Sequence, residues 1–174
     1  MNDIIIDKDY KLKIITDEYM KLVQGLCEKC IDYYGSYYGT YTIIDVAKEI
    51  FEDIPPNKDY IDKFVFGIFN NNRDLVGIID IVRDFPINEE WIIGLMLIEP
   101  NERERKLGKT IHKSLIKWAS SLGARSFRIG VIKDNYVAMK FWTGLGYKRI
   151  KEVTMDLSGK KNIVYVMRLE FNLY

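Results

Sequence analysis

A short basic turn between a predicted strand and a predicted helix is the stretch of this sequence best suited to chemistry. The apolar run at residues 91–98 leads through Glu99 and Pro100 into a basic segment at 101–109, and a helical pattern follows to Lys117. Where a strand leads into a helix start, unpaired backbone N–H groups and the helix dipole point at one place. We therefore expect this turn to bind a phosphate-bearing ligand.

Composition narrows the class of protein. A length of 174 residues fits a single domain that buries its own core. The apolar runs fall well short of the ~18 residues of a membrane span, and the N-terminal segment lacks the basic region and cleavage site of a signal peptide. We therefore expect a cytoplasmic protein without a membrane partner, and the net charge of +1 argues against a nucleic-acid partner.

The charges are unevenly distributed along the chain. Residues 1–60 hold twelve Asp and Glu against seven Lys, a balance of −5, whereas residues 101–130 hold eight Lys and Arg against two Glu, a balance of +6. The first segment favours contact with a cation, and the second favours phosphate groups.

Two cysteines and one histidine raise the question of a metal. Cys27 and Cys30 form a C-x-x-C, but no second pair exists and the single histidine, His112, is remote in sequence. We expect no metal, and we expect both cysteines to be small, partly buried helix residues. His112 lies beside the apolar stripe of its helix, which predicts a flank or surface position rather than a catalytic one.

Hydrophobic periodicity predicts one domain with a mixed sheet. Strands are expected at residues 10–15, 64–69, 75–82, 91–98, 126–132, 147–155 and 163–170. Helices are expected at residues 16–30, 42–53, 107–122 and 135–145. In the first helix, the residues whose spacing predicts a core face are Leu22, Val23, Leu26, Cys30 and Ile31.

A tyrosine-rich segment at residues 32–41 is punctuated by glycines and fits neither the helical nor the strand period. Its candidate substrate-binding residues are Tyr33, Tyr34, Tyr37 and Tyr38. These rings either wall a substrate pocket or pack a loop onto the core, and the sequence leaves both interpretations open.

The basic turn has two interpretations. In the first, Gly108, Lys109 and Thr110 resemble the end of a P-loop, with Asp134 after the next strand as a magnesium ligand. A complete P-loop needs a glycine five residues before Gly108, where this chain has Arg103. The tight phosphate cradle lacks its first hinge, which argues against a nucleotide-hydrolysing protein.

The second interpretation rests on two motifs that lie about 30 residues apart. The first motif comprises Pro100, Arg103, Lys106 and Gly108, and the second comprises Asn135, Ala138, Phe141, Trp142, Leu145, Gly146 and Tyr147. Together they resemble the GNAT superfamily of acyl-CoA-dependent N-acetyltransferases. The resemblance implies one α/β (α+β) domain over residues 1–174, in which helices flank a central, mostly antiparallel sheet.

The resemblance also implies where acetyl-CoA binds as co-substrate, without a metal. The strands at 91–98 and 126–132 would splay apart around the pantetheine arm, and the turn would hold the pyrophosphate. Asn135 would hydrogen-bond the pantetheine arm, and a backbone N–H of Leu97 or Ile98 would hold the thioester oxygen. The residues assigned to the coenzyme are Met96, Leu97, Ile98, Arg103, Glu104, Arg105, Lys106, Leu107, Gly108, Lys109, Asn135, Ala138, Phe141 and Trp142.

Two positions depart from the family pattern. Lys106 stands where the family has its first glycine, so either the backbone there tolerates a side chain or the pyrophosphate sits differently. Trp142 stands where many members have a tyrosine that serves as general acid, and an indole N–H lacks useful acidity. Since a thiolate leaving group has a pKa of ~8.5, it needs only modest help to depart.

The expected reaction is direct attack of a primary amine of a small molecule or peptide on the thioester, in a ternary complex. Strand alternation places Glu90 on one face with Ile92, Met96 and Ile98, which makes it the candidate base. Tyr136 or a tyrosine of the 32–41 segment is the alternative. A non-catalytic acyl-CoA sensor stays a second hypothesis, and the protein is expected to be a monomer or homodimer.

Overall fold

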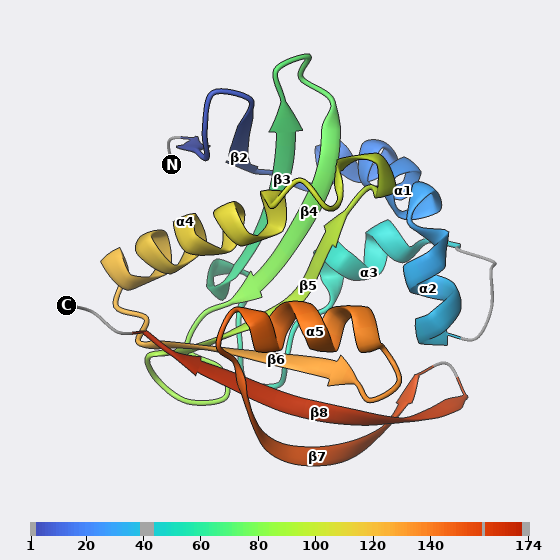
Figure 1. The fold of residues 1–174 in the computed structure, drawn as a ribbon, viewed down its shortest axis with the longest axis vertical. Helices are drawn as coiled ribbons and strands as arrows, with labels where there is room; N and C mark the ends of the chain where they lie inside the picture. The colour runs from blue at the N-terminus through green and yellow to red at the C-terminus, as the bar shows by residue number, and fades with distance from the viewer. Residues whose placement is uncertain (1–2, 39–43, 158, 172–174) are drawn as a thin grey trace.

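The computed structural model describes residues 3–38, 44–157 and 159–171, which form an eight-stranded sheet with helices on both faces (Figure 1). The strand order is β1-β2-β3-β4-β5-β6-β8-β7, and only β5 and β6 pair in parallel. The strands are β1 (Ile4–Ile5), β2 (Tyr10–Ile14), β3 (Lys63–Asn70), β4 (Leu75–Val82), β5 (Glu90–Ile98), β6 (Ser126–Ile132), β7 (Lys148–Leu157) and β8 (Lys160–Glu170). The α-helices are α1 (Met20–Lys29), α2 (Ile31–Tyr38), α3 (Val46–Glu52), α4 (Leu107–Ser121) and α5 (Tyr136–Gly144). The predicted mixed, mostly antiparallel sheet flanked by helices is confirmed.

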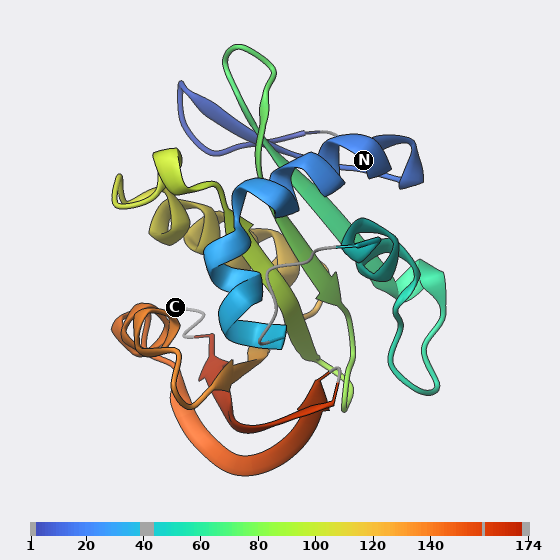
Figure 2. The same ribbon diagram turned by 90° about the vertical axis from the view of Figure 1, so that its right-hand side faces the viewer.

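Two hydrophobic clusters cover the two faces of the sheet. One cluster joins the strands to α4 and α5, through residues such as Ile79, Ile111 and Trp142. The other joins them to α1, α2 and α3, through residues such as Ile78 and Leu26. Figure 2 shows α1, α2 and α3 in front of the central strands, away from α5. We call the side of the sheet covered by α4 and α5 the α4–α5 face, and the side covered by α1, α2 and α3 the α1–α3 face.

Helix α4 follows directly from its apolar spacing. Leu107, Ile111, Leu115 and Ala119 recur every fourth residue and are all buried against the sheet. No helix in the described part of the chain is both long and apolar enough to cross a bilayer.

Strand β5 contains one extra residue that reverses its alternation. Ile93 pairs with Ile81 and Leu95 pairs with Asp80, which leaves Gly94 as a β-bulge between them. As a result Trp91 and Ile93 share the α4–α5 face with Met96 and Ile98, whereas Leu95 and Leu97 lie on the other face. The alternation predicted across the whole strand is therefore wrong beyond the bulge.

Strands β5 and β6 separate soon after they begin to pair. Their register contains only three pairs, and the last joins Ile92 to Arg128. Beyond that pair β5 continues to Ile98 and β6 to Ile132, but the two strands no longer pair with each other, so they diverge (Figure 1). The splay that the family resemblance implied is confirmed.

Helix α2 corrects the sequence prediction for the tyrosine-rich segment. Residues 31–38 form a helix, although Gly35 lies in its middle. Tertiary packing outweighs the low helix propensity of glycine here, because Tyr34 is buried and its hydroxyl donates to Cys27 Sγ at 3.3 Å. The next helix, α3, is shorter than the predicted 42–53, and residues 42–43 lie outside the described part.

The predicted core face of α1 is only partly right. Val23, Leu26 and Cys30 are buried, but Leu22 and Ile31 are exposed. Leu22 lies one position beside the buried stripe, and a helix packed on a single sheet face buries only that stripe. The two cysteines are fully buried rather than partly buried.

His112 also corrects a prediction. It is 2% exposed rather than on the flank or surface, and its Nε2 lies 2.9 Å from the Tyr147 hydroxyl. Helix α4 is covered by the sheet on one side and by α5 on another, which widens its buried face beyond the apolar stripe. Burial lowers the pKa of His112 to about 4, so the imidazole is neutral at pH 7.

Candidate active site

The basic turn has the geometry of an anion site. A short 3-10 helix (Pro100–Glu102) leads to two residues in the left-handed region, Glu104 at φ 65° and Lys106 at φ 62°. Helix α4 starts directly afterwards, and its first internal hydrogen bond runs from the Thr110 N–H to the Lys106 carbonyl at 3.1 Å. The backbone N–H groups of residues 107–109 precede this bond, so the helix itself does not satisfy them. They are the donors that a phosphate group requires.

The left-handed backbone at Lys106 explains the departure from the family pattern. A side chain in this region costs roughly 1–2 kcal/mol, whereas glycine adopts it freely. Lys106 nevertheless holds φ 62° with ψ 4° as the N-cap of α4. The turn therefore keeps a conformation that suits glycine while carrying an extra positive charge.

The side chains of the turn divide into two groups. Arg105, Lys106 and Lys109 are exposed around the start of α4. Arg103 points elsewhere: its guanidinium contacts both carboxylate oxygens of Asp32 on α2, at 2.5 and 3.2 Å, and its Nε donates to the Ile98 carbonyl at 2.7 Å. The hydrogen bond from Arg103 holds the pKa of Asp32 below its usual value. Arg103 thus fastens the turn to α2.

Two more contacts join the same elements. Lys29, at the end of α1, forms an ion pair with Glu99 at 2.8 Å, and Cys30 Sγ lies 3.7 Å from the Ile98 carbonyl. Burial raises the pKa of the Cys30 thiol to about 11, so it stays protonated at neutral pH. The α1–α2 junction therefore supports the strand end from which the turn begins.

The backbone of β5 shows which groups face the gap toward β6. The Glu99 N–H donates to the Val76 carbonyl at 2.9 Å. Hydrogen-bonded pairs alternate in an antiparallel ladder, so Leu97, opposite Ile78, also directs its backbone groups at β4. Met96 and Ile98 direct theirs away from β4, into the gap. Of the two predicted thioester donors, only Ile98 has a backbone N–H on the correct side.

The second motif lines the opposite side of the gap. Asn135 caps α5, because its Oδ1 accepts a hydrogen bond from the Ala138 N–H at 3.0 Å. A β-carbon on Gly108 would lie 3.1 Å from Phe141, so α4 and α5 approach closely only because residue 108 is glycine. This contact brings the start of α4, the end of β5 and α5 together.

Trp142 and its neighbours form an aromatic cluster. Trp142 is 8% exposed and lies edge to face with Phe141, His112 and Tyr147, with ring centroids 5.0 to 5.9 Å apart. Burial raises the pKa of the Tyr147 hydroxyl, which bonds to His112. The tryptophan at the usual tyrosine position thus anchors α5 to α4.

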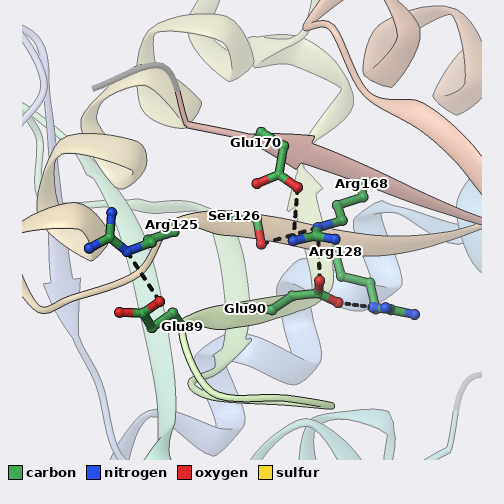
Figure 3. A network of polar contacts seen from close by, with 7 residues as sticks. All are labelled: Glu89, Glu90, Arg125, Ser126, Arg128, Arg168 and Glu170. Carbon is green, nitrogen blue, oxygen red and sulfur yellow. Dashed lines mark hydrogen bonds and ion pairs between the residues drawn. The ribbon is translucent and has the colours of Figure 1, made fainter. Parts of the chain in front are cut away.

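Glu90 is the centre of a buried charge network at the start of β5 (Figure 3). It is 1% exposed, and its two carboxylate oxygens pair with Arg128 and with Arg168, the latter at 2.8 Å. Arg168 also pairs with Glu170 at 2.8 Å. The bulge places Glu90 on the face opposite Met96 and Ile98, so the reason for choosing it as base is wrong.

Among the tyrosines whose side chains are described, Tyr136 lies on a different element from Tyr33 and Tyr34. Tyr136 is 76% exposed at the start of α5, whereas Tyr34 is buried in the core against α1. Tyr33 packs edge to face on Tyr34 at 5.1 Å. Tyr37 and Tyr38 belong to α2, but their side chains lie outside the described residues.

The sequence analysis missed one buried ion pair. Asp80 on β4 lies beside the bulge, and Lys63 Nζ lies 2.8 Å from each of its carboxylate oxygens. Burial raises the pKa of Asp80, and Lys63 offsets part of this rise. A lone acidic residue in the otherwise apolar strand 75–82 was the signal that could have revealed it.

The gap between β5 and β6 is distinct from a hollow on the surface beside α1. That hollow, of about 400 Å³, lies between α1 and α3 and is lined by residues such as Gln24, Glu28 and Lys48. Its lining lacks the groups of the basic turn. Among the described residues, no group of three His, Cys, Asp or Glu side chains is placed to hold a metal ion.

A comparison with protein families finds one match over most of the chain. The profile described as the acetyltransferase (GNAT) family matches residues 25–147. This range includes the splayed strands, the basic turn and both motifs. A comparison with curated proteins found no match.

Solved structures with the same fold cover nearly the whole chain. The ribosomal-protein alpha-N-acetyltransferase RimL is 14% identical, with a TM-score of 0.79 over 98% of this chain and 94% of that one. Spermidine N-acetyltransferase from Vibrio cholerae, in complex with CoA and spermine, is 12% identical, with a TM-score of 0.69 over 94% and 96%. PaiA N-acetyltransferase from Thermoplasma acidophilum, in complex with coenzyme A, is 16% identical, with a TM-score of 0.66 over 93% and 99%. At these identities the similarity establishes the shared fold.

Proposed function

The chain belongs to the acetyltransferase (GNAT) family, whose acetylation depends on acyl-CoA, and from this premise we propose that it transfers an acetyl group from acetyl-CoA to a primary amine. The family identified from the two motifs is thereby confirmed. The observation that carries the proposal is the divergence of β5 and β6 beyond Ile92 and Arg128, beside a helix start whose N–H groups at residues 107–109 have no partner within the helix. We propose that residues 1–174 act as a single acetyltransferase domain.

The residues around the gap fit coenzyme A. The N–H groups at the start of α4 and the cations Arg105, Lys106 and Lys109 suit its pyrophosphate. The backbone of Met96 and the N–H of Ile98 face the gap and suit the amide groups of the pantetheine arm, whereas the Ile98 carbonyl already accepts a hydrogen bond from Arg103. The Oδ1 of Asn135 accepts a hydrogen bond from the Ala138 N–H of α5. Its side-chain NH₂ group can therefore donate a hydrogen bond to the pantetheine arm.

The remaining coenzyme assignments acquire specific roles in this proposal. Glu104 and Leu107 shape the turn, and Ala138 and Phe141 provide the apolar wall on α5. Arg103 acts through the position of the turn rather than through direct contact, because Asp32 already holds its guanidinium. Leu97 supports the strand from the α1–α3 face.

Transfer needs three events at the thioester. The amine must lose a proton, since an alkylammonium with a pKa near ~10 is protonated at neutral pH. The neutral amine then attacks the carbonyl carbon, and the N–H of Ile98 stabilises the negative charge that develops on the oxygen. The C–S bond breaks and the thiolate leaves. A single direct attack suits this site because the described residues at the gap include no nucleophilic cysteine; Cys27 and Cys30 are buried in α1 and at its end.

The acceptor is a primary amine of a small molecule or of a peptide, and we propose that it approaches from the α1–α3 face. The α4–α5 face is occupied by the turn and α5, which hold the coenzyme in this proposal. The acidic balance of residues 1–60 suits a cationic acceptor on the face that α1, α2 and α3 cover.

Calorimetry with acetyl-CoA and a thiol-release assay examine this proposal. The amine panel contains spermine, a free amino acid and a peptide with an unblocked N-terminus. We expect binding of acetyl-CoA and thiol release with at least one amine. Binding without release for any amine would instead support the acyl-CoA sensor, and absence of binding would refute both functions.

A charge-reversal variant makes the binding test specific. Lys109→Glu places a negative charge beside the proposed pyrophosphate site, and we expect it to weaken acetyl-CoA binding by about tenfold or more. Lys117→Glu, at the exposed C-terminal half of the same helix, is the matched control. Equal affinity of both variants would contradict the assignment of the turn.

A further inference from the structure

Asp80 and Lys63 form a buried ion pair on the α1–α3 face, at the closed end of the β5–β6 gap. Asp80 shares this face with Ile78, and Lys63 shares it with Val65. The Lys63 side chain is 4% exposed and its Nζ also donates to the Asp53 carbonyl at the end of α3. Lys63 is thus held in place from two sides.

The carboxylate of Asp80 reaches the bulge in β5. A β-carbon on Gly94 would lie 3.2 Å from Asp80 Oδ2, which is tighter than an ordinary contact, so the carboxylate lies directly beside the glycine. Gly94 is exposed, and it lies two residues beyond Ile92, the last residue of β5 that pairs with β6. A group seated in the gap at Gly94 would therefore meet the Asp80 carboxylate.

Lys63 contacts both oxygens of the Asp80 carboxylate. Its Nζ lies 2.8 Å from Oδ1 and 2.8 Å from Oδ2. A carboxylate offers about four acceptor sites, so a single ammonium does not use them all. The carboxylate can therefore accept a further hydrogen bond from a ligand beside Gly94.

We propose that Asp80 is the catalytic base that takes the proton from the acceptor ammonium at the Gly94 bulge, an inference that rests on the proposed acetyl transfer. The Asp80 carboxylate accepts one proton from the ammonium and becomes a carboxylic acid. The neutral amine forms the new C–N bond as the C–S bond breaks, and the second amine proton passes to the departing thiolate. Asp80 then releases its proton to solvent.

The environment of Asp80 suits this task. Burial disfavours the carboxylate and raises its pKa, and the Asp53 side chain acts in the same direction, whereas Lys63 favours the charged form. A base with a raised pKa accepts protons more readily than an exposed aspartate, and the Lys63 charge favours the ionised form that the base requires. Glu90, by contrast, has both oxygens committed to arginines.

The experiment measures kcat/KM for thiol release against pH, with the best amine of the panel. Asp80→Asn should lower kcat/KM by about 100-fold or more and remove the acid limb of the pH profile. Lys63→Met should move that limb to higher pH, because the positive charge that favours the carboxylate is lost. The double variant Asp80→Asn, Lys63→Met removes both buried charges and keeps the test possible should the single variant unfold.

Controls separate this role from a structural one. Asp62 has the same side-chain exposure as Asp80, 15%, and pairs with Lys58 at 3.0 Å and with Arg83 at 2.6 Å. Asp62→Asn breaks these two ion pairs and should leave the acid limb in place. Glu90→Gln should lower the Tm but retain the limb. If Asp80→Asn keeps the wild-type kcat/KM and the acid limb of the pH profile, Asp80 is not the base, while the proposed acetyl transfer still stands. A wild type that releases no thiol with any amine would overturn the proposed transfer, and with it the role of Asp80.

Discussion

His112 makes the stability of this protein depend on pH in a window that can be calculated. It is the single histidine of the chain, and burial lowers its folded-state pKa from 6.5 to about 4. A histidine with a depressed pKa binds its proton more readily in the unfolded chain. The stability that it contributes is therefore complete above pH 6.5 and is lost as the pH falls toward 4.

The magnitude follows from the linkage between protonation and unfolding. With the two pKa values of 6.5 and about 4, the free energy of unfolding should fall by about 2 kcal/mol between pH 7 and pH 5. For a domain of this size that corresponds to a Tm lower by about 4–8 °C.

Urea unfolding at pH 7 and pH 5 measures this effect, followed by tryptophan fluorescence because Trp142 contacts the His112 ring. His112→Gln keeps a polar partner for the Tyr147 hydroxyl and does not titrate. Carboxylates such as Asp32 contribute equally to both proteins, so the difference between wild type and variant isolates the histidine. A difference that is the same at both pH values would refute the argument, as would an imidazole resonance that titrates near pH 6.5 in the folded protein.

Three further variants examine the geometry of the site. Lys106→Gly removes a side chain from the left-handed region and should raise the free energy of unfolding by up to about 1 kcal/mol in urea. Because the variant also loses a cation proposed for the pyrophosphate, calorimetry should show weaker acetyl-CoA binding, and an unchanged affinity would mean that the Lys106 charge does not contribute. Gly94→Ala places a β-carbon 3.2 Å from Asp80 Oδ2, so the carboxylate must shift by a few tenths of an ångström. This variant should lower kcat/KM for thiol release while acetyl-CoA still binds, and an unchanged kcat/KM would mean that the reaction does not depend on the position of the carboxylate. Asp32→Asn breaks an exposed ion pair and should cost less than about 1 kcal/mol in urea unfolding; a much larger loss would mean that α2 depends on this contact.

Much of the fold could be predicted because its signals are local. The strands 64–69 and 75–82 alternate or run apolar over their whole length, and α4 repeats every fourth residue, so their positions follow from period alone. The coenzyme turn was found in the same way, since a strand, a basic segment and a helix start are adjacent in sequence. Helix α2 was missed because its stability comes from the packing of Tyr34 on α1, which no local pattern reports.

The side-chain contacts of the turn needed the structure. Arg103 was expected at the phosphate because its position in the motif and its charge both favour that role. Its actual partner, Asp32, is 71 residues away in sequence and belongs to a segment in which no helix was predicted. Contacts between distant segments depend on how the elements pack, and charge alone does not select among several nearby acids.

The bulge at Gly94 separates two acids that lie on the same face of the sheet. Strand alternation has a period of two, so one inserted residue exchanges the faces of every side chain beyond it. Glu90 and Asp80 therefore both lie on the α1–α3 face, opposite Met96 and Ile98. Glu90 pairs with Arg128 and Arg168 where β5 still pairs with β6, whereas Asp80 lies beside Gly94, beyond the last of these pairs. The position of each acid relative to the bulge, rather than its face, therefore favours Asp80 as the proposed proton acceptor.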